Sequence, residues 1–179
     1  SVLRVPLKAV TTLAYPFRSR EAMVPILVYH RVCPLYFSKS TPYANVYPDE
    51  FERQLQYLSA NFEVITISEF LRREAEGRIN GTEASITFDD GFRDNYIYAF
   101  PVLKRLGLKA TFFLTTKYMG ADTAFPWMRM DASGKADMAE NRERWLPLTW
   151  DSVREMARHG MEFGTHTHTH RDSLSNMTI

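Results

Sequence analysis

The sequence predicts an α/β fold of the kind that forms a parallel sheet or a barrel. From Pro25 onward, short apolar runs alternate with segments of helical periodicity. Reactive residues follow the ends of two of the predicted strands, at the edge where α/β folds collect functional groups. The length of 179 residues and the 45% hydrophobic content fit one domain with a substantial core.

Five short apolar segments are predicted to be strands, because each is bounded by a helical pattern or by turn residues. They are residues 26–30, 63–67, 84–88, 110–114 and 161–165. The first is expected to be buried, and the third and fifth lead directly into clusters of reactive side chains.

The first two helices are predicted from their termini. Pro48 suits the first position of a helix, and Asp49 and Glu50 are favourably placed near its positive dipole end. Ser68 is expected to cap a second helix, which is closed by Gly77.

Two further helices lie later in the chain. Residues 95–106 predict a helix in which Pro101 causes a kink or a late start. Thr149 is expected to cap a helix through residue 158, with Gly160 after its end.

The domain organisation is predicted to be simple. Residues 1–24 are interpreted as an N-terminal extension and residues 25–179 as the main domain. Residues 115–148 mix Gly, Pro, Met, Trp and charged residues, which predicts a long insertion loop, typical of lids and binding loops.

Composition argues against several classes of protein. The 22 Lys and Arg residues balance 21 Asp and Glu residues, so charge offers no case for binding nucleic acid. Cys33 is the single cysteine and rules out a disulfide within the chain. The sequence contains no apolar run of about 18 residues, so it predicts no transmembrane helix. Lys8 interrupts the apolar start, which therefore does not resemble a signal peptide.

The first reactive cluster is Thr87-Phe88-Asp89-Asp90-Gly91. Adjacent carboxylates repel each other unless a positive charge lies beside them, and glycine allows a sharp backbone turn. Alone, the pattern is equally consistent with a solvated turn at the end of a strand.

The second cluster is Gly164-Thr165-His166-Thr167-His168-Thr169-His170. If this segment were extended, His166, His168 and His170 would share one face. Clustered neutral imidazoles favour Zn²⁺ or another divalent first-row ion. The alternative is a solvent-exposed polar loop without a ligand.

Together the clusters offer two carboxylates and up to three imidazoles. Two imidazoles and one carboxylate would leave metal positions open for water and substrate, and the second carboxylate would be free to act as a base. This arrangement is the one expected of metal-assisted hydrolysis.

In this order, and at strand ends, the two clusters resemble the first two motifs of the polysaccharide deacetylase family, which is also called the NodB-homology or carbohydrate esterase family. The second family motif is a His, a Ser or Thr, two further residues and a His, which residues 166–170 match. The similarity extends from about Pro25 to Leu174. It implies part of a distorted (β/α) barrel of the polysaccharide deacetylase type, lacking its C-terminal strands.

The resemblance also implies residue roles. Asp89 would be the catalytic base, and Asp90, His166 and His170 would bind a divalent metal. Zn²⁺ is the first expectation, and Co²⁺, Ni²⁺ and Fe²⁺ also suit these ligands. His168 falls on the variable position of the motif, which takes it off the metal.

Several other side chains are candidates to contact a substrate. His30 follows a predicted strand and is a candidate to face the same cleft, although a structural role is commoner. Trp127, in the predicted insertion, is the better aromatic candidate for a sugar contact, whereas Trp150 is expected in the core. Arg93 and Asp94 either brace the site or begin a solvated helix.

Two later motifs of the family are not found before Ile179, namely an Arg that orients the base and a His that acts as general acid. We therefore expect a fragment of a longer enzyme, a truncated product, or a barrel that a second chain completes. An unpaired edge strand would favour self-association. The resemblance also favours a cell-envelope or extracytoplasmic location.

The leading interpretation is a metal-dependent hydrolase that removes N-acetyl groups from N-acetylhexosamine residues of a polysaccharide. Metal-activated water would attack the carbonyl, with Asp89 as base. The alternatives are hydrolysis of another carbon–nitrogen amide bond, and a non-catalytic module that binds metal or glycan.

Overall fold

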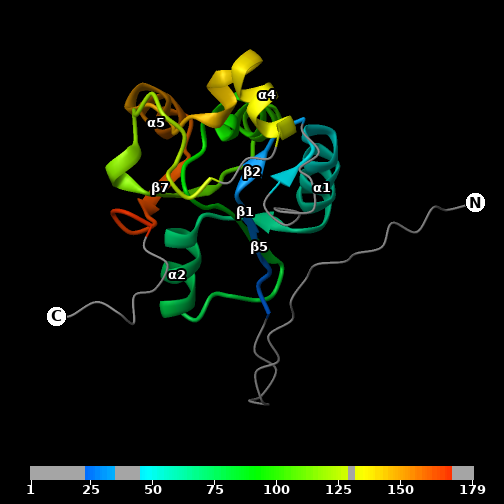
Figure 1. The fold of residues 1–179 in the computed structure, drawn as a ribbon. Helices are drawn as coiled ribbons and strands as arrows, with labels where there is room; N and C mark the ends of the chain where they lie inside the picture. The colour runs from blue at the N-terminus through cyan, green and yellow to red at the C-terminus, as the bar shows by residue number, and fades with distance from the viewer. Residues whose placement is uncertain (1–22, 35–44, 129–131, 171–179) are drawn as a thin grey trace, which may run out of the picture.

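The computed structural model describes residues 23–34, 45–128 and 132–170. Its centre is a sheet in the order β1-β5-β6-β7, with β4 paired to the start of β5 (Figure 1). The strands are β1 (Ile26–Tyr29), β4 (Glu63–Val64), β5 (Glu83–Phe88), β6 (Thr111–Leu114) and β7 (Glu162–Thr165). A second, small sheet pairs β2 (Arg31–Val32) with β3 (Asn45–Val46). All these pairs are parallel, which confirms the predicted α/β class.

Helices connect the strands. They are α1 (Pro48–Asn61), α2 (Ile67–Ala75), the π-helix η1 (Asn95–Ala99), α3 (Phe100–Leu106), α4 (Ala132–Glu140), α5 (Trp150–Arg158) and the 3₁₀ turns η2 (Thr116–Tyr118) and η3 (Arg142–Trp145). Among the described residues, no helix combines the length and apolar character needed to cross a membrane.

Most predicted helix termini are confirmed. Pro48 begins α1, and the Thr149 side chain accepts a hydrogen bond from Ser152 N at the start of α5. Pro101 lies in the first turn of α3, where its missing N–H is harmless. The prediction that Ser68 caps the second helix is wrong. Thr66 caps α2 instead, because α2 begins two residues before the predicted position.

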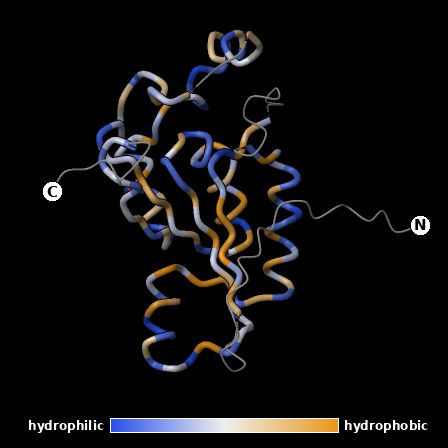
Figure 2. Tube along the Cα trace, turned by 60° about the horizontal axis from the view of Figure 1, so that its bottom comes forward, coloured by the Kyte–Doolittle hydropathy of each residue, from blue (hydrophilic) through white to orange (hydrophobic). Residues whose placement is uncertain are grey.

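One face of the sheet carries the core. Phe88 of β5 stacks on Phe112 of β6 with ring centroids 4.5 Å apart, and Phe112 stacks on Phe163 of β7. Phe51 of α1 packs edge-on against Phe88 and Tyr29, which fixes α1 on this face. Figure 2 shows hydrophobic residues along the central strands and alternating character along α1.

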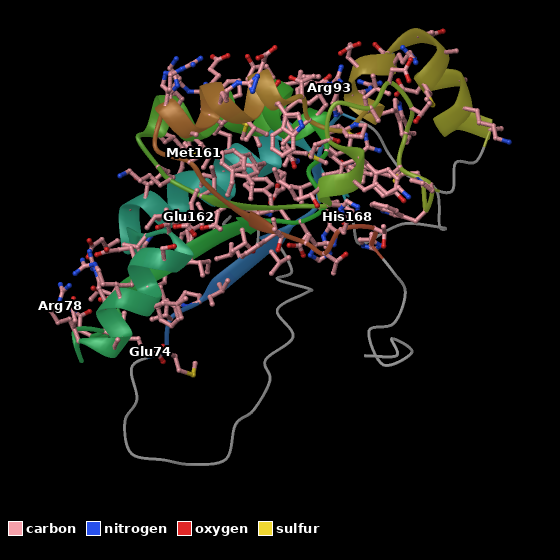
Figure 3. All side chains as sticks on the ribbon, turned by 90° about the vertical axis from the view of Figure 1, so that its left-hand side faces the viewer. Glu74, Arg78, Arg93, Met161, Glu162 and His168 are labelled. Atoms are coloured by element: carbon pink, nitrogen blue, oxygen red, sulfur yellow. The ribbon has the colours of Figure 1, made fainter. Side chains whose placement is uncertain are left out.

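The opposite face holds α2. Ile67 N donates to Thr111 Oγ1 at 3.0 Å, and Ser68 N donates to the Glu162 carboxylate. In Figure 3, α2, marked by its residue Glu74 and by Arg78 just after its end, lies across the sheet from α5.

The strand β1 is less buried than predicted. Ile26 and Val28 are 46% and 57% exposed, because β1 is an edge strand of the described sheet and these residues face away from α1. Trp150 is also 46% exposed rather than in the core. It lies in the first turn of α5, whose buried residues are Ser152, Val153 and Met156.

The insertion predicted over residues 115–148 is partly helical. It contains α4 and η3, and it ends in buried residues, among them Trp145 and Leu148. The short α4 includes Gly134, a poor helix former, so its sequence offers little helical signal. Most of the predicted N-terminal extension, residues 1–22, lies outside the described residues.

Candidate metal centre

The two reactive clusters meet at the carboxyl edge of the sheet. Asp89 and Asp90 follow β5, and His166 follows β7, with β6 between them. Thr115, directly after β6, joins the two loops, because its backbone N–H donates to Asp90 O at 3.1 Å and its hydroxyl lies 3.5 Å from His166 O. Figure 3 shows β7 running from Glu162 to the loop that carries His168.

The backbone turns sharply directly after Asp89, through two residues in left-handed conformations. Asp90 has φ 72° and Gly91 has φ 90°. The positive φ of Gly91 favours glycine, and a Cβ there would also lie 2.9 Å from Leu114 Cδ2, which would have to shift. The side chain of Asp90 is 5% exposed, whereas that of Asp89 is 19% exposed.

The histidine loop turns immediately after β7 rather than continuing as a strand. Thr167 has φ 62° and His170 has φ 51°, and Thr167 Oγ1 accepts a hydrogen bond from His170 N at 2.9 Å. The three imidazoles therefore do not share one face. His168 lies 3.1 Å from Thr116 Oγ1, through its Nδ1 atom, and stays outside the ligand cluster.

Three donor atoms form a candidate metal site. Asp90 Oδ1 lies 3.2 Å from His170 Nε2 and 3.7 Å from His166 Nε2, and one ligand atom from each residue lies within 4.8 Å of the others. In the described part of the chain, Asp90 Oδ1 is buried without a hydrogen-bond partner. Burial raises the pKa of Asp90, and the nearby histidines oppose that shift. A carboxylate and two imidazoles with an unsatisfied buried oxygen fit a divalent ion.

Asp89 lies beside this cluster and between two histidines. Its Oδ1 is 4.0 Å from His166 Nδ1, and its Oδ2 is 4.0 Å from His30 Nε2. His30, a candidate to face the same cleft, therefore lies beside Asp89. His30 is 39% exposed at its side chain, which leaves its ring accessible.

The sequence did not predict the buried ion pair that Arg31, the residue after His30, forms with Asp94. Arg31 Nε donates to Asp94 Oδ2 at 2.6 Å, and the guanidinium stacks over Trp145. Asn95, in the π-helix η1, donates to both His30 O and Asp94 Oδ1. Burial raises the pKa of Asp94 to about 6, opposed by Arg31. The only sequence signal was that Arg31 stands between a strand and the apolar Val32.

Asp94 is therefore not part of a solvated helix start, because its side chain is fully buried. Arg93 donates to Pro147 O at 2.9 Å and forms an ion pair with Glu143. Both residues thus attach the start of η1 to neighbouring segments, Asp94 to Arg31 and Arg93 to the insertion.

Trp127 borders the metal site through a ring contact. Its ring stacks on that of His170, with centroids 4.2 Å apart and planes 16° apart. It also stacks on Phe125, at 4.6 Å and 22°. Trp127 is half-buried in the segment between η2 and α4.

Comparisons with known proteins identify the family of this chain. The sequence profile of the family described as polysaccharide deacetylase matches residues 77–178, more than half of the chain. The Bacillus subtilis protein YxkH is 30% identical over 178 residues, which cover 98% of this chain and 53% of that protein. A poly-beta-1,6-N-acetyl-D-glucosamine N-deacetylase of Staphylococcus epidermidis is 30% identical over 132 residues, covering 73% of this chain and 40% of the relative. The chain thus spans about half the length, or less, of these relatives.

Solved structures show the same fold. The deacetylase PplD of Streptococcus pyogenes, solved with acetate, has a TM-score of 0.61 at 27% identity, over 83% of this chain and 58% of that one. IcaB from Ammonifex degensii has a TM-score of 0.60 at 30% identity, over 81% of this chain and 53% of that one. The expected fold, part of a (β/α) barrel of this type, is confirmed. The chain belongs to the polysaccharide deacetylase family.

Proposed function

We propose that the protein is a metal-dependent hydrolase that removes N-acetyl groups from N-acetylhexosamine residues of a polysaccharide. The observation that carries the proposal is the cluster of Asp90, His166 and His170, with Asp89 beside it but outside it. The name of the Staphylococcus epidermidis relative supports an N-acetylglucosamine polymer as the substrate class.

The position of each residue supports a proposed role. Asp90 Oδ1 and the two Nε2 atoms of His166 and His170 would hold the ion, with Zn²⁺ as the first expectation. When bound, such an ion activates water and stabilises the negative charge that develops on a carbonyl oxygen. Asp89 is the base that accepts a proton from the attacking water.

His30 is proposed to contact the substrate at its acetamido nitrogen. Its Nε2 atom lies 4.0 Å from Asp89 Oδ2, whereas His166 Nδ1 lies 4.0 Å from the other carboxylate oxygen, Oδ1. An imidazole there can donate a proton to the leaving amine. His30 would then supply a general acid from within this chain.

Two alternatives remain distinct proposals. The same base and ligands would hydrolyse another carbon–nitrogen amide that binds with its carbonyl at the ion. A non-catalytic module would bind metal or glycan without turnover. The position of β1 at the edge of the described sheet supports the further proposal of self-association along that edge.

Acetate release tests the proposal. The chain is loaded with Zn²⁺ or Co²⁺ and incubated with oligomers of β-1,6- and β-1,4-linked N-acetylglucosamine, and acetate is measured. Release that stops on chelation and resumes when metal is restored is expected. Release only from a simple amide such as acetanilide would favour the first alternative. Metal binding without any acetate would favour the second.

A further inference from the structure

We infer that Trp127 is a positioning residue that holds the ring of the metal ligand His170 by stacking on it. This inference rests on the proposed metal site. It replaces the sugar contact that the sequence predicts for Trp127 with a role inside the ligand shell.

The first argument is that, within the part of the chain that the structure describes, His170 lacks the usual support for a metal-binding histidine. Such a ring normally donates its second nitrogen to a carboxylate, a carbonyl or water, which fixes its orientation. The Nδ1 atom of His170 is buried and has no hydrogen-bond partner among the residues that the structure describes. Its Nε2 atom is the one directed at Asp90 Oδ1.

The second argument is the contact that His170 does make. The Trp127 ring lies nearly parallel to the imidazole, at a centroid distance of 4.2 Å. A stack restricts rotation of the imidazole out of its plane, and this rotation would move Nε2 away from Asp90. The support matters here because the backbone of His170 is left-handed, with φ 51°.

The third argument concerns what Trp127 can still offer to a sugar. A sugar ring needs a free aromatic face, and the indole already has two nearly parallel neighbours, His170 and Phe125. Tyr118 packs against it edge-on, at 5.4 Å. Phe125 is buried, so this aromatic group anchors Trp127 to the core rather than leaving it free at the surface.

The test is a Co²⁺ titration of the metal-free chain, followed by visible absorption. Trp127→Ala is expected to weaken Co²⁺ binding about tenfold, as loss of a residue that orients a ligand does. Trp127→Phe keeps a stacking ring and is expected to stay within about twofold of the wild type. Trp150→Ala removes an exposed tryptophan of α5 and serves as the matched control, with unchanged Co²⁺ affinity.

Kinetics at saturating metal complete the test. With the glycan oligomer as substrate, the KM of Trp127→Ala is expected to match that of the wild type. Wild-type Co²⁺ affinity combined with a raised KM would overturn the inference and restore the sugar contact. Equal weakening in Trp127→Phe and Trp127→Ala would also overturn it, since the stack would not be the cause. A wild-type chain that binds no Co²⁺ would remove the metal site and this role together, which distinguishes the two failures.

Discussion

His170 Nε2 lies 3.2 Å from Asp90 Oδ1, although the two residues belong to loops that follow different, non-adjacent strands. The parallel sheet produces this contact, because β5, β6 and β7 all end at the same edge. The contact joins the two reactive clusters into one candidate metal site.

The separation of His170 from His168 leads to a direct mutational test. His170→Ala removes a proposed ligand, so two of three protein ligands remain. It is expected to weaken Co²⁺ binding by more than the factor of about 10–100 that is typical of losing a residue that only supports a ligand. His168→Ala is the matched control, since its ring contacts Thr116 and lies outside the cluster. Both are measured by Co²⁺ titration. Equal losses in the two variants would contradict the assignment of ligands.

The position of His30 beside Asp89 predicts a loss of turnover without a loss of metal. Removing a general acid typically lowers the rate by about 10²–10⁴-fold, so His30→Ala should show such a drop in kcat/KM with unchanged Co²⁺ affinity. His159→Ala, at the far end of α5, is the control and should retain full activity. Full activity in His30→Ala would assign His30 a structural role.

The motifs and most secondary structure could be predicted from the sequence, because they depend on local chemistry. Alternating apolar runs indicated β5 and β6, and the hydroxyl of Thr149 marked the start of α5. The conformation of the histidine loop could not be predicted in this way. It depends on left-handed backbone at Thr167 and on hydrogen bonds to the loop after β6.

Tertiary contacts account for the other differences. The burial of Asp94 depends on Arg31, which is distant in sequence, and the exposure of Val28 depends on its place at a sheet edge. The ring contacts of Trp127 also depend on tertiary structure. Its position in a loop suggested a sugar contact, whereas its ring neighbours are defined only by the folded chain.

The raised pKa of Asp94 predicts a pH dependence of stability. The folded state holds this proton with a pKa of about 6, above the ordinary value of 3.8. The resulting stabilisation is therefore fully present below pH 3.8 and is lost as the pH rises through 6, with a slope of up to about 1.4 kcal/mol per pH unit.

The measurement is urea unfolding of the wild type and Asp94→Asn between pH 4.5 and pH 7.5. The difference in unfolding free energy between the two should grow in favour of the wild type as the pH falls. A difference that is independent of pH would show that Asp94 titrates normally.

The cap of α5 offers a test of the fold that is independent of the metal. Thr149 Oγ1 accepts a hydrogen bond from Ser152 N at 3.1 Å, and its loss in Thr149→Ala should cost about 1 kcal/mol of unfolding free energy. Thr149→Ser retains an oxygen acceptor and should stay close to the wild type. Denaturation that is identical for Thr149→Ala and the wild type would mean that the cap does not stabilise α5.

The central claim is that Asp89 moves a proton while Asp90, His166 and His170 hold the ion. Asp89→Asn tests it most directly when Co²⁺ affinity and acetate release from N-acetylglucosamine oligomers are measured on the same preparation. The account predicts a Co²⁺ affinity equal to that of the wild type, with acetate release reduced by about 10²-fold or more. Acetate release at the wild-type rate, or loss of Co²⁺ binding, would contradict it.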